Sequence, residues 1–106
     1  MNFNKILVLG STGFVGRNFI KSLDNKQKKS FLFPKREELD LLNIDSIKSY
    51  LNINEPDFAI NFAGKVGGII SNSTRNYDFL IKNLYINMNL INSLKDYGLN
   101  NFLNVS

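Results

Sequence analysis

Apolar residues along the chain fall into short runs of strand type and longer segments of helical spacing. Residues 3–9 form a run rich in β-formers, and residues 14–23 repeat apolar side chains at helical spacing up to Asp24. The segment "SFLF" at 30–33 predicts a second strand, and Pro34 closes it because proline donates no ladder hydrogen bond. The first third of the chain therefore predicts a strand, a glycine turn, a helix and a strand in that order.

The middle of the chain predicts an extended piece, a helix and a buried strand. The segment "ELDLLN" at 38–43 has a short extended pattern, and Asn43 is a candidate N-cap for a helix that stops before Glu55 and Pro56. Within residues 57–63, the run that follows Asp57 is apolar with one interruption at Asn61, which is typical of a central parallel strand covered on both faces. A polar, glycine-rich loop follows.

The last third predicts one long helix over 77–97, a C-cap at Gly98 and a strand at 102–105. The helix has two apolar stripes, which together cover more arc than one sheet face needs. The first stripe is Leu80, Ile81, Leu84, Met88 and Ile91, and the second is Phe79, Ile86, Leu90 and Leu94. Either both stripes are buried within a complete domain, or the second stripe packs against a partner subunit.

Alternating strands and helices with short connections predict an α/β fold with a Rossmann-type, doubly wound parallel sheet. The 106 residues suffice for one domain, which we expect to be a nucleotide-binding domain over residues 1–106. We expect about five strands in it, as the N-terminal part of such a sheet.

Composition narrows the classes of function. The chain has no cysteine and no histidine, so we expect no disulfide and no metal site. The net charge is +4, but lysine and arginine cluster only in "KQKKS" at 26–30. A single cluster of this kind favours a solvated turn over a nucleic-acid interface. The apolar run at 6–9 is too short for a signal peptide or a membrane span. We therefore expect a cytoplasmic protein with neither a nucleic-acid nor a membrane partner.

Three glycines separate the first strand from the first helix, where a turn brings backbone N–H groups toward a diphosphate at the helix N-terminus. Gly10 allows the turn, Gly13 leaves room for the phosphate, and Gly16 lets helix and strand approach closely. Ser11 and Thr12 add hydroxyls that can reach phosphate. The pattern favours dinucleotide binding over a merely tight turn.

The end of the second strand indicates which dinucleotide is bound. An NAD-binding domain usually places an acidic residue on the ribose 2′-hydroxyl there, whereas a 2′-phosphate requires a cation. Lys35 and Arg36 occupy this place, and Arg36 can pair with a phosphate through two hydrogen bonds. The sequence therefore favours NADP over NAD, with a solvated basic turn as the alternative.

Two segments resemble a known family. The turn "GSTGFVG" resembles the cofactor turn of the extended short-chain dehydrogenase/reductases, which act mainly on nucleotide sugars. The stretch "NFAGKVGGIISNST" at 61–74, with the helix after it, resembles the GDP-L-fucose synthase family, NADPH-dependent enzymes that epimerise and then reduce a GDP-4-keto-6-deoxy-mannose. The matching positions are Ala63, Lys65, Val66, Gly67, Gly68, Ile69 and Asn72. Gly64 replaces an alanine, and "RNYDF" lacks the proline usual before that helix.

The resemblance implies a site and partners. It places Asp40 against the adenine with Leu41 beside it, although Asp40 can equally cap a turn. Lys65 contacts a phosphate or the substrate, or is a plain loop lysine. The full cofactor-binding set is then Gly10, Ser11, Thr12, Gly13, Phe14, Val15, Gly16, Arg36, Asp40, Leu41, Ala63, Gly64 and Lys65. The partners implied are a GDP-sugar substrate and, through the helix at 77–97, a second copy of the full-length protein in a homodimer.

Catalysis in the resembled superfamily uses a serine and a tyrosine followed four residues later by lysine. None of the tyrosines has that lysine: Tyr50, Tyr77, Tyr85 and Tyr97 are followed by Asn54, Ile81, Asn89 and Asn101. The family's serine falls immediately after Ser106. We therefore expect an N-terminal fragment that holds NADP but lacks the substrate domain and is inactive alone. The alternatives are another nucleotide-sugar epimerase or dehydratase, and a non-catalytic NADP-binding module.

Overall fold

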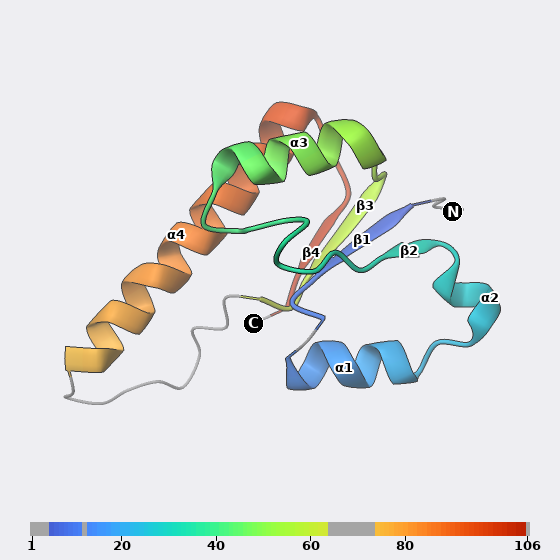
Figure 1. Ribbon diagram of the computed structural model, residues 1–106, viewed down its shortest axis with the longest axis horizontal. Coiled ribbons are helices and arrows are strands. Elements are labelled where there is room, and N and C mark those ends of the chain that lie inside the picture. The colour runs from blue at the N-terminus through green and yellow to red at the C-terminus, as the bar shows by residue number, and fades with distance from the viewer. Residues whose placement is uncertain (1–4, 12, 64–73, 106) are drawn as a thin grey trace.

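The structure, a computed structural model, describes residues 5–11, 13–63 and 74–105. Within these residues strands and helices alternate with short connections (Figure 1). The strands are β1 (Ile6–Leu9), β2 (Phe31–Leu32), β3 (Phe58–Asn61) and β4 (Phe102–Asn104), and the helices are α1 (Phe14–Lys21), α2 (Asn25–Lys28), α3 (Ile44–Asn54) and α4 (Thr74–Tyr97).

The four described strands form one parallel sheet in the order β2-β1-β3-β4. Ile6 of β1 pairs with Phe31 on one side and with Phe58 on the other. The chain therefore leaves β1 toward one edge and crosses back to the other, so the strand order reverses at β1. Open α/β sheets bind their ligands at the carboxyl ends of the strands beside such a reversal. The predicted α/β class and Rossmann-type sheet are confirmed.

Helices cover both faces of the sheet, as a doubly wound fold requires. Figure 1 shows α1 on one side and α3 with α4 on the other. On the α1 side, the Phe19 ring lies 5.5 Å from that of Phe31 and 5.4 Å from that of Phe62, measured between centroids. On the other side α3 and α4 pack on β1 and β3. The buried cluster there comprises Leu7, Leu9, Leu39, Ile47, Tyr50, Leu51, Ala59, Leu90 and Leu94.

The predicted ends of two helices are confirmed by their hydrogen bonds. Asn43 caps α3, because its Oδ1 accepts from the N–H groups of Asp45 at 3.0 Å and Ser46 at 3.3 Å. At the end of α4, Gly98 has a φ of +92° and donates its N–H to the Leu94 carbonyl at 3.0 Å. Glycine suits this position because it adopts a positive φ without the steric penalty that a Cβ would bring.

Two local predictions were wrong. Residues 38–43 form turns rather than an extended piece, and the Asn43 N–H donates to the Asp40 carbonyl at 3.0 Å. The basic segment at 26–30 is partly helical, because α2 begins with a capping box: Asp24 Oδ1 accepts from the Gln27 N–H at 2.7 Å, and Gln27 Oε1 accepts from the Asp24 N–H at 2.9 Å. The described part of the sheet accordingly has four strands where about five were expected.

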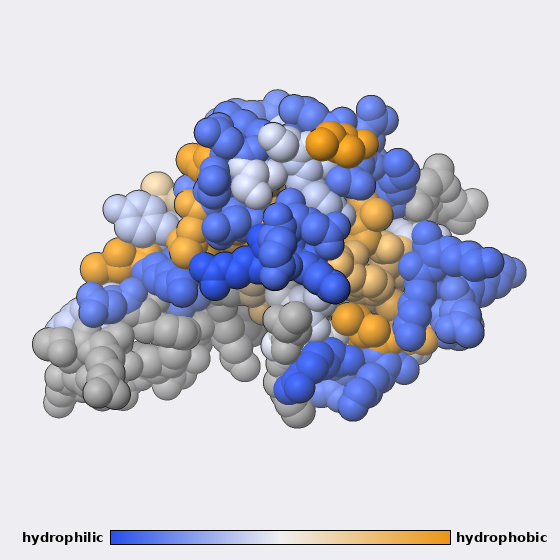
Figure 2. Space-filling model, in the orientation of Figure 1, coloured by the Kyte–Doolittle hydropathy of each residue, from blue (hydrophilic) through white to orange (hydrophobic). Residues whose placement is uncertain are grey.

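The arrangement of the two stripes on α4 differs from both predicted alternatives. The second stripe is the buried one: Leu90 is 0% and Leu94 3% exposed, because this face of α4 packs on the sheet and α3. The first stripe is exposed, with Met88 at 57%. Figure 2 shows apolar side chains along the outer edge of α4. No helix in the described part of the chain is long and apolar enough to cross a membrane.

Candidate nucleotide-binding site

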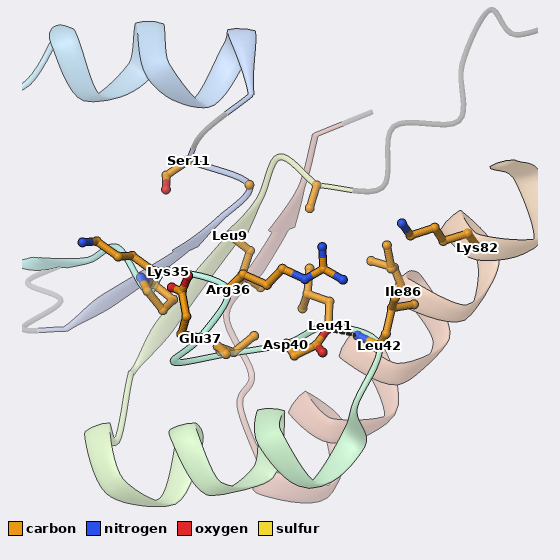
Figure 3. Close-up of a pocket in the computed structure, with 14 residues that line it drawn as sticks. Leu9, Ser11, Lys35, Arg36, Glu37, Asp40, Leu41, Leu42, Lys82 and Ile86 are labelled. Carbon is orange, nitrogen blue, oxygen red and sulfur yellow. Dashed lines mark hydrogen bonds between the residues drawn. The ribbon is translucent and has the colours of Figure 1, made fainter.

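A cavity of about 540 Å³ opens at the carboxyl ends of β1, β2 and β3 (Figure 3). Its volume lies within the range of small-molecule sites, roughly 300–1,000 Å³. The segment after β1, the turns between β2 and α3, the end of β3 and one face of α4 supply its walls. The described lining residues are Leu9, Gly10, Ser11, Pro34, Lys35, Arg36, Glu37, Leu39, Asp40, Leu41, Leu42, Ala63, Lys82 and Ile86.

Gly10 makes the turn at the end of β1 possible. Its φ is +76°, in the left-handed region that side chains rarely adopt. A Cβ at this position would also lie 2.5 Å from the Ala63 nitrogen and 2.8 Å from the Phe62 carbonyl carbon. Gly10 is therefore required twice, by its conformation and by the close approach of the backbone that leaves β3.

Gly13 and Gly16 have the geometry that the glycine pattern predicts. A Cβ at the buried Gly16 would lie 2.3 Å from the Gly10 carbonyl oxygen, so α1 approaches the turn as closely as its backbone allows. Gly13 is the N-cap of α1, and a Cβ there would make an ordinary van der Waals contact of 3.6 Å with the Gly10 carbonyl oxygen. That Gly13 leaves room for a phosphate stays a prediction.

The structure brings together most of the predicted cofactor residues that it describes. Gly10, Ser11, Arg36, Asp40, Leu41 and Ala63 line the cavity, whereas Gly13, Val15 and Gly16 are not among its described lining residues. Val15 instead lies exposed on α1. Thr12, Gly64 and Lys65 lie outside the described residues, as does the side chain of Phe14 at the start of α1.

Arg36 is the cation placed to meet an anion in the cavity. Its guanidinium points across the opening toward α4, whereas Lys35 points away from it (Figure 3). Arg36 is exposed and has no ion pair among the described residues. A guanidinium without a carboxylate partner is available for a phosphate, which it can bind through two parallel hydrogen bonds.

Asp40 fixes the turn between β2 and α3. Its Oδ1 accepts from the Leu42 N–H at 3.0 Å, and its own N–H donates to Ser46 Oγ at 2.9 Å. The alternative role for Asp40, capping a turn, is therefore confirmed. Asn89 of α4 donates to the Leu41 carbonyl at 3.0 Å and ties the same turn to α4. Contact with an adenine stays a prediction, and the half-buried carboxylate still lines the cavity.

Sequence reasoning missed the wall that α4 contributes. Lys82 and Ile86 stand one helical turn apart on the same face and close the cavity opposite Arg36. Ile86 belongs to the second stripe, for which the sequence did not decide between burial within the domain and contact with a partner. Nothing in the sequence around Lys82 indicates that it lines a site. Only the packing of α4 against β1 and β3 places Lys82 beside the cavity. With Lys35 and Arg36 it makes the lining richer in cations than in the carboxylates of Glu37 and Asp40.

The fold is of the Rossmann type, and the cavity lies at the edge of the sheet where such folds bind their ligands. The chain belongs to the NAD dependent epimerase/dehydratase family, whose sequence profile matches residues 6–106. The resemblance to GDP-L-fucose synthase predicted from the sequence is confirmed by the relatives that the chain matches.

Two curated relatives and one solved structure illustrate the similarity. GDP-L-colitose synthase of Yersinia pseudotuberculosis is 38% identical over 101 residues, covering 95% of this chain and 32% of the relative. GDP-L-fucose synthase 1 of Arabidopsis thaliana is 33% identical over 99 residues, covering 93% and 31%. The structure of a GDP-L-fucose synthetase from Naegleria fowleri bound to NADP superposes with a TM-score of 0.75 at 26% identity, covering 95% of this chain and 30% of that one. The chain thus spans about a third of the length of the relatives it matches.

Proposed function

We propose that this chain supplies the cofactor-binding half of an NADPH-dependent epimerase/reductase that acts on a GDP-4-keto-6-deoxy sugar, as in GDP-L-fucose synthesis. The observation that carries the proposal is the cavity at the strand reversal, with Gly10 and Ser11 of the glycine turn at one end and Arg36, which has no ion pair among the described residues, at the other. Membership of the family and the names of the relatives support a nucleotide sugar as the substrate class.

The described residues fit a dinucleotide. Gly13 has no side chain to obstruct the start of α1, whose first N–H groups have no partner within the helix and are suited to a diphosphate. Ser11 adds a hydroxyl there, and Arg36 meets the 2′-phosphate at the other end. Between them Asp40 and Leu41 lie against the adenine, with Ile86 of α4 on the opposite wall.

In that reaction a bound NADPH supplies the hydride for a C4 carbonyl. The residues of this chain bind and orient the cofactor: the glycine turn holds the diphosphate, and the apolar wall of Leu9, Leu41 and Ile86 excludes water from the adenosine end. In this proposal Thr12, Gly64 and Lys65 complete the phosphate end. None of the described residues is assigned a proton transfer, and we propose that the chain alone does not turn over substrate.

We also propose that the protein is cytoplasmic and forms a homodimer through α4. The exposed first stripe supports the dimer, because apolar surface of this extent on one helix favours contact with another protein. The exposed members are Leu80, Ile81, Leu84, Met88 and Ile91. Sedimentation of Ile81→Asp and Met88→Asp variants tests this: the proposal predicts monomers where the unchanged protein is dimeric. A monomeric unchanged protein in full-length form contradicts it.

A second candidate function is an NADP-binding module without chemistry of its own. In this alternative the glycine turn and Arg36 bind NADP, and no catalytic step follows. Reading the gene past the codon for Ser106 separates the two candidates. A serine followed later by Tyr-x-x-x-Lys supports the enzyme, and product analysis with GDP-linked 4-keto sugars then distinguishes GDP-fucose synthesis from other epimerase or dehydratase reactions. A stop codon contradicts the enzyme.

Comparative titration tests the cofactor assignment. We expect NADPH to bind this chain more tightly than NADH, and Arg36→Ala to remove most of that preference because the guanidinium meets only the 2′-phosphate. Lys35→Ala is the matched control, since Lys35 neighbours Arg36 but points away from it. Equal affinities for NADPH and NADH in the unchanged chain would contradict the assignment of NADP.

A further inference from the structure

Asn61, the last residue of β3, is a buried amide that joins three segments of the fold. It is fully buried, and its Oδ1 accepts from the Ala63 N–H at 2.9 Å. Its Nδ2 donates to Asn104 Oδ1 of β4 at 2.9 Å and, at a longer 3.4 Å, to Asn87 Oδ1 of α4. The fully buried side chain of Asn61, at the carboxyl edge of the sheet, thus has hydrogen-bond partners for both its oxygen and its nitrogen.

The direction of these hydrogen bonds is fixed at both ends by backbone groups. The Ala63 N–H can only donate, so Asn61 must present its oxygen to it. Asn87 donates its Nδ2 to the Asn83 carbonyl at 2.9 Å, which can only accept, so Asn87 presents its oxygen to Asn61. Only this placement of oxygen and nitrogen in the two side-chain amides satisfies both the Ala63 N–H and the Asn83 carbonyl.

The backbone that Asn61 holds is the wall of the glycine turn. The Ala63 nitrogen is the atom nearest to a Cβ placed on Gly10, at 2.5 Å, so the two backbones touch without room for a side chain. The Phe62 N–H donates to the Leu9 carbonyl at 2.8 Å and extends the same contact. A shift of Ala63 therefore displaces Gly10, which begins the turn toward α1.

Asn61 also holds the carboxyl end of β4. Besides the side-chain bond to Asn104, the Asn61 carbonyl accepts from the Val105 N–H at 2.9 Å. The end of β4 and the glycine turn are thus both attached to one residue, and both lie at the carboxyl edge where Rossmann-type sheets bind their ligands.

We propose that Asn61 is a positioning residue: its buried amide fixes Ala63 against Gly10 and thereby sets the affinity of the glycine turn for the diphosphate of the cofactor. This inference rests on the proposed NADP site and assigns it a residue that does not itself touch the ligand. Removal of the amide leaves the Ala63 N–H without its acceptor and lets the backbone beside Gly10 shift.

The test compares two ligands and two variants. NADPH reaches the glycine turn, whereas adenosine 2′-monophosphate has the adenine, ribose and 2′-phosphate but no diphosphate. The variant is Asn61→Leu, which keeps the side-chain volume without the amide. The control is Asn101→Leu, because the Asn101 Nδ2 donates to the Asp57 carbonyl at 3.4 Å and so joins the same two strands at their opposite end.

We expect Asn61→Leu to weaken NADPH by about tenfold, the equivalent of one hydrogen bond, and adenosine 2′-monophosphate by less than about twofold. We expect Asn101→Leu to leave the ratio of the two affinities unchanged, even where it lowers the melting temperature. Equal weakening of both ligands by Asn61→Leu, or no weakening, overturns the proposal because a merely structural role has no reason to separate them. Should Asn61→Leu not fold, Asn104→Ala removes one partner from an exposed side chain and is expected to change the ratio in the same direction.

Amide hydrogen exchange of the ligand-free chain gives a second readout. We expect the Ala63 N–H to exchange faster in Asn61→Leu and at its original rate in Asn101→Leu. An unchanged rate overturns the coupling whatever the ligand does. If the unchanged chain binds neither NADPH nor adenosine 2′-monophosphate, the proposed function fails, and the role of Asn61 in cofactor affinity fails with it. Binding without the expected change in ratio overturns the role of Asn61 alone.

Discussion

The carbonyl oxygen of Gly10 occupies the place that a side chain at Gly16 would need. A Cβ on Gly16 would lie 2.3 Å from that oxygen and 2.8 Å from the Cα of Ser11. Helix α1 is thus seated directly on the turn that leaves β1. The absence of a side chain at Gly16 therefore sets how closely α1 can approach the turn.

Gly16→Ala is therefore expected to destabilise the fold. The added methyl group meets backbone rather than a flexible side chain, so α1 must move, at a cost of about 1–3 kcal/mol in the free energy of unfolding. Chemical denaturation measures this. Gly13→Ala is the matched control, because a Cβ there meets nothing closer than 3.6 Å. Equal stabilities of the two variants would contradict the close packing of α1.

Gly13→Ala is expected to have the opposite profile, with stability retained and NADPH binding lost. Its φ of −75° is accessible to alanine, so the backbone is not strained. Its methyl group instead takes up space that we assign to the diphosphate. We expect a loss of NADPH affinity of at least about tenfold, equivalent to 1.4 kcal/mol, in a fluorescence titration. Unchanged affinity for NADPH would contradict the placement of the diphosphate beside Gly13.

Lys82→Ala is expected to weaken NADPH by a few-fold and to reduce the dependence of binding on salt. Lys82 is an exposed cation on the cavity wall, and the attraction of such a charge for a phosphate is screened at high ionic strength. Lys95→Ala is the control, since Lys95 is exposed on the last turn of α4 and is not among the described lining residues. Equal effects of the two variants would exclude Lys82 from the site.

Ser93→Ala is expected to stabilise the fold by up to about 1 kcal/mol, because a buried polar group without a partner opposes folding. Ser93 is 1% exposed, and its Oγ has no hydrogen-bond partner among the described residues. Ser49→Ala on the exposed face of α3 reports the gain from helix propensity alone. The prediction fails if Ser93→Ala is the less stabilising of the two.

Stability is expected to fall above pH 10 partly through Tyr50. Burial, and then the nearby Glu38 carboxylate, raises the pKa of the Tyr50 phenol above its ordinary value of 10.0. The folded chain therefore keeps the phenol proton where the unfolded chain releases it. This contribution to stability is complete below pH 10 and is lost as the pH rises through the raised pKa. Tyr50→Phe should flatten the decline in the free energy of unfolding, measured by chemical denaturation across this pH range, and an equal decline in both proteins would contradict the role of Tyr50.

Local chemistry explains which parts of the fold could be predicted from the sequence. Strand β1 with its glycine turn, the Asn43 cap and the Gly98 end are each specified by residues within a few positions of one another. The capping box of α2 was equally local, and the spacing of Asp24 and Gln27 is the signal that could have revealed it.

The remaining features depend on tertiary packing. Both stripes of α4 have helical spacing, and only contact with α3 and the sheet decides that Leu90 is buried while Met88 is exposed. Lys82 lines the cavity for the same reason. The turns at 38–43 depend on Asp40 and Ser46, whose hydrogen bond forms only once α3 is in place. The pattern of apolar residues in "ELDLLN" does not indicate that hydrogen bond.

The most direct test of the central claim is a titration of the isotope-labelled chain with NADPH, followed through its backbone amide resonances. We predict saturable shifts at the cavity-lining residues Gly10, Arg36, Asp40 and Ala63 and at Gly13 of the glycine turn, with none at the basic segment 26–30. Absence of shifts at saturating NADPH, or shifts gathered at 26–30, would contradict the account of this chain as a dinucleotide-binding domain.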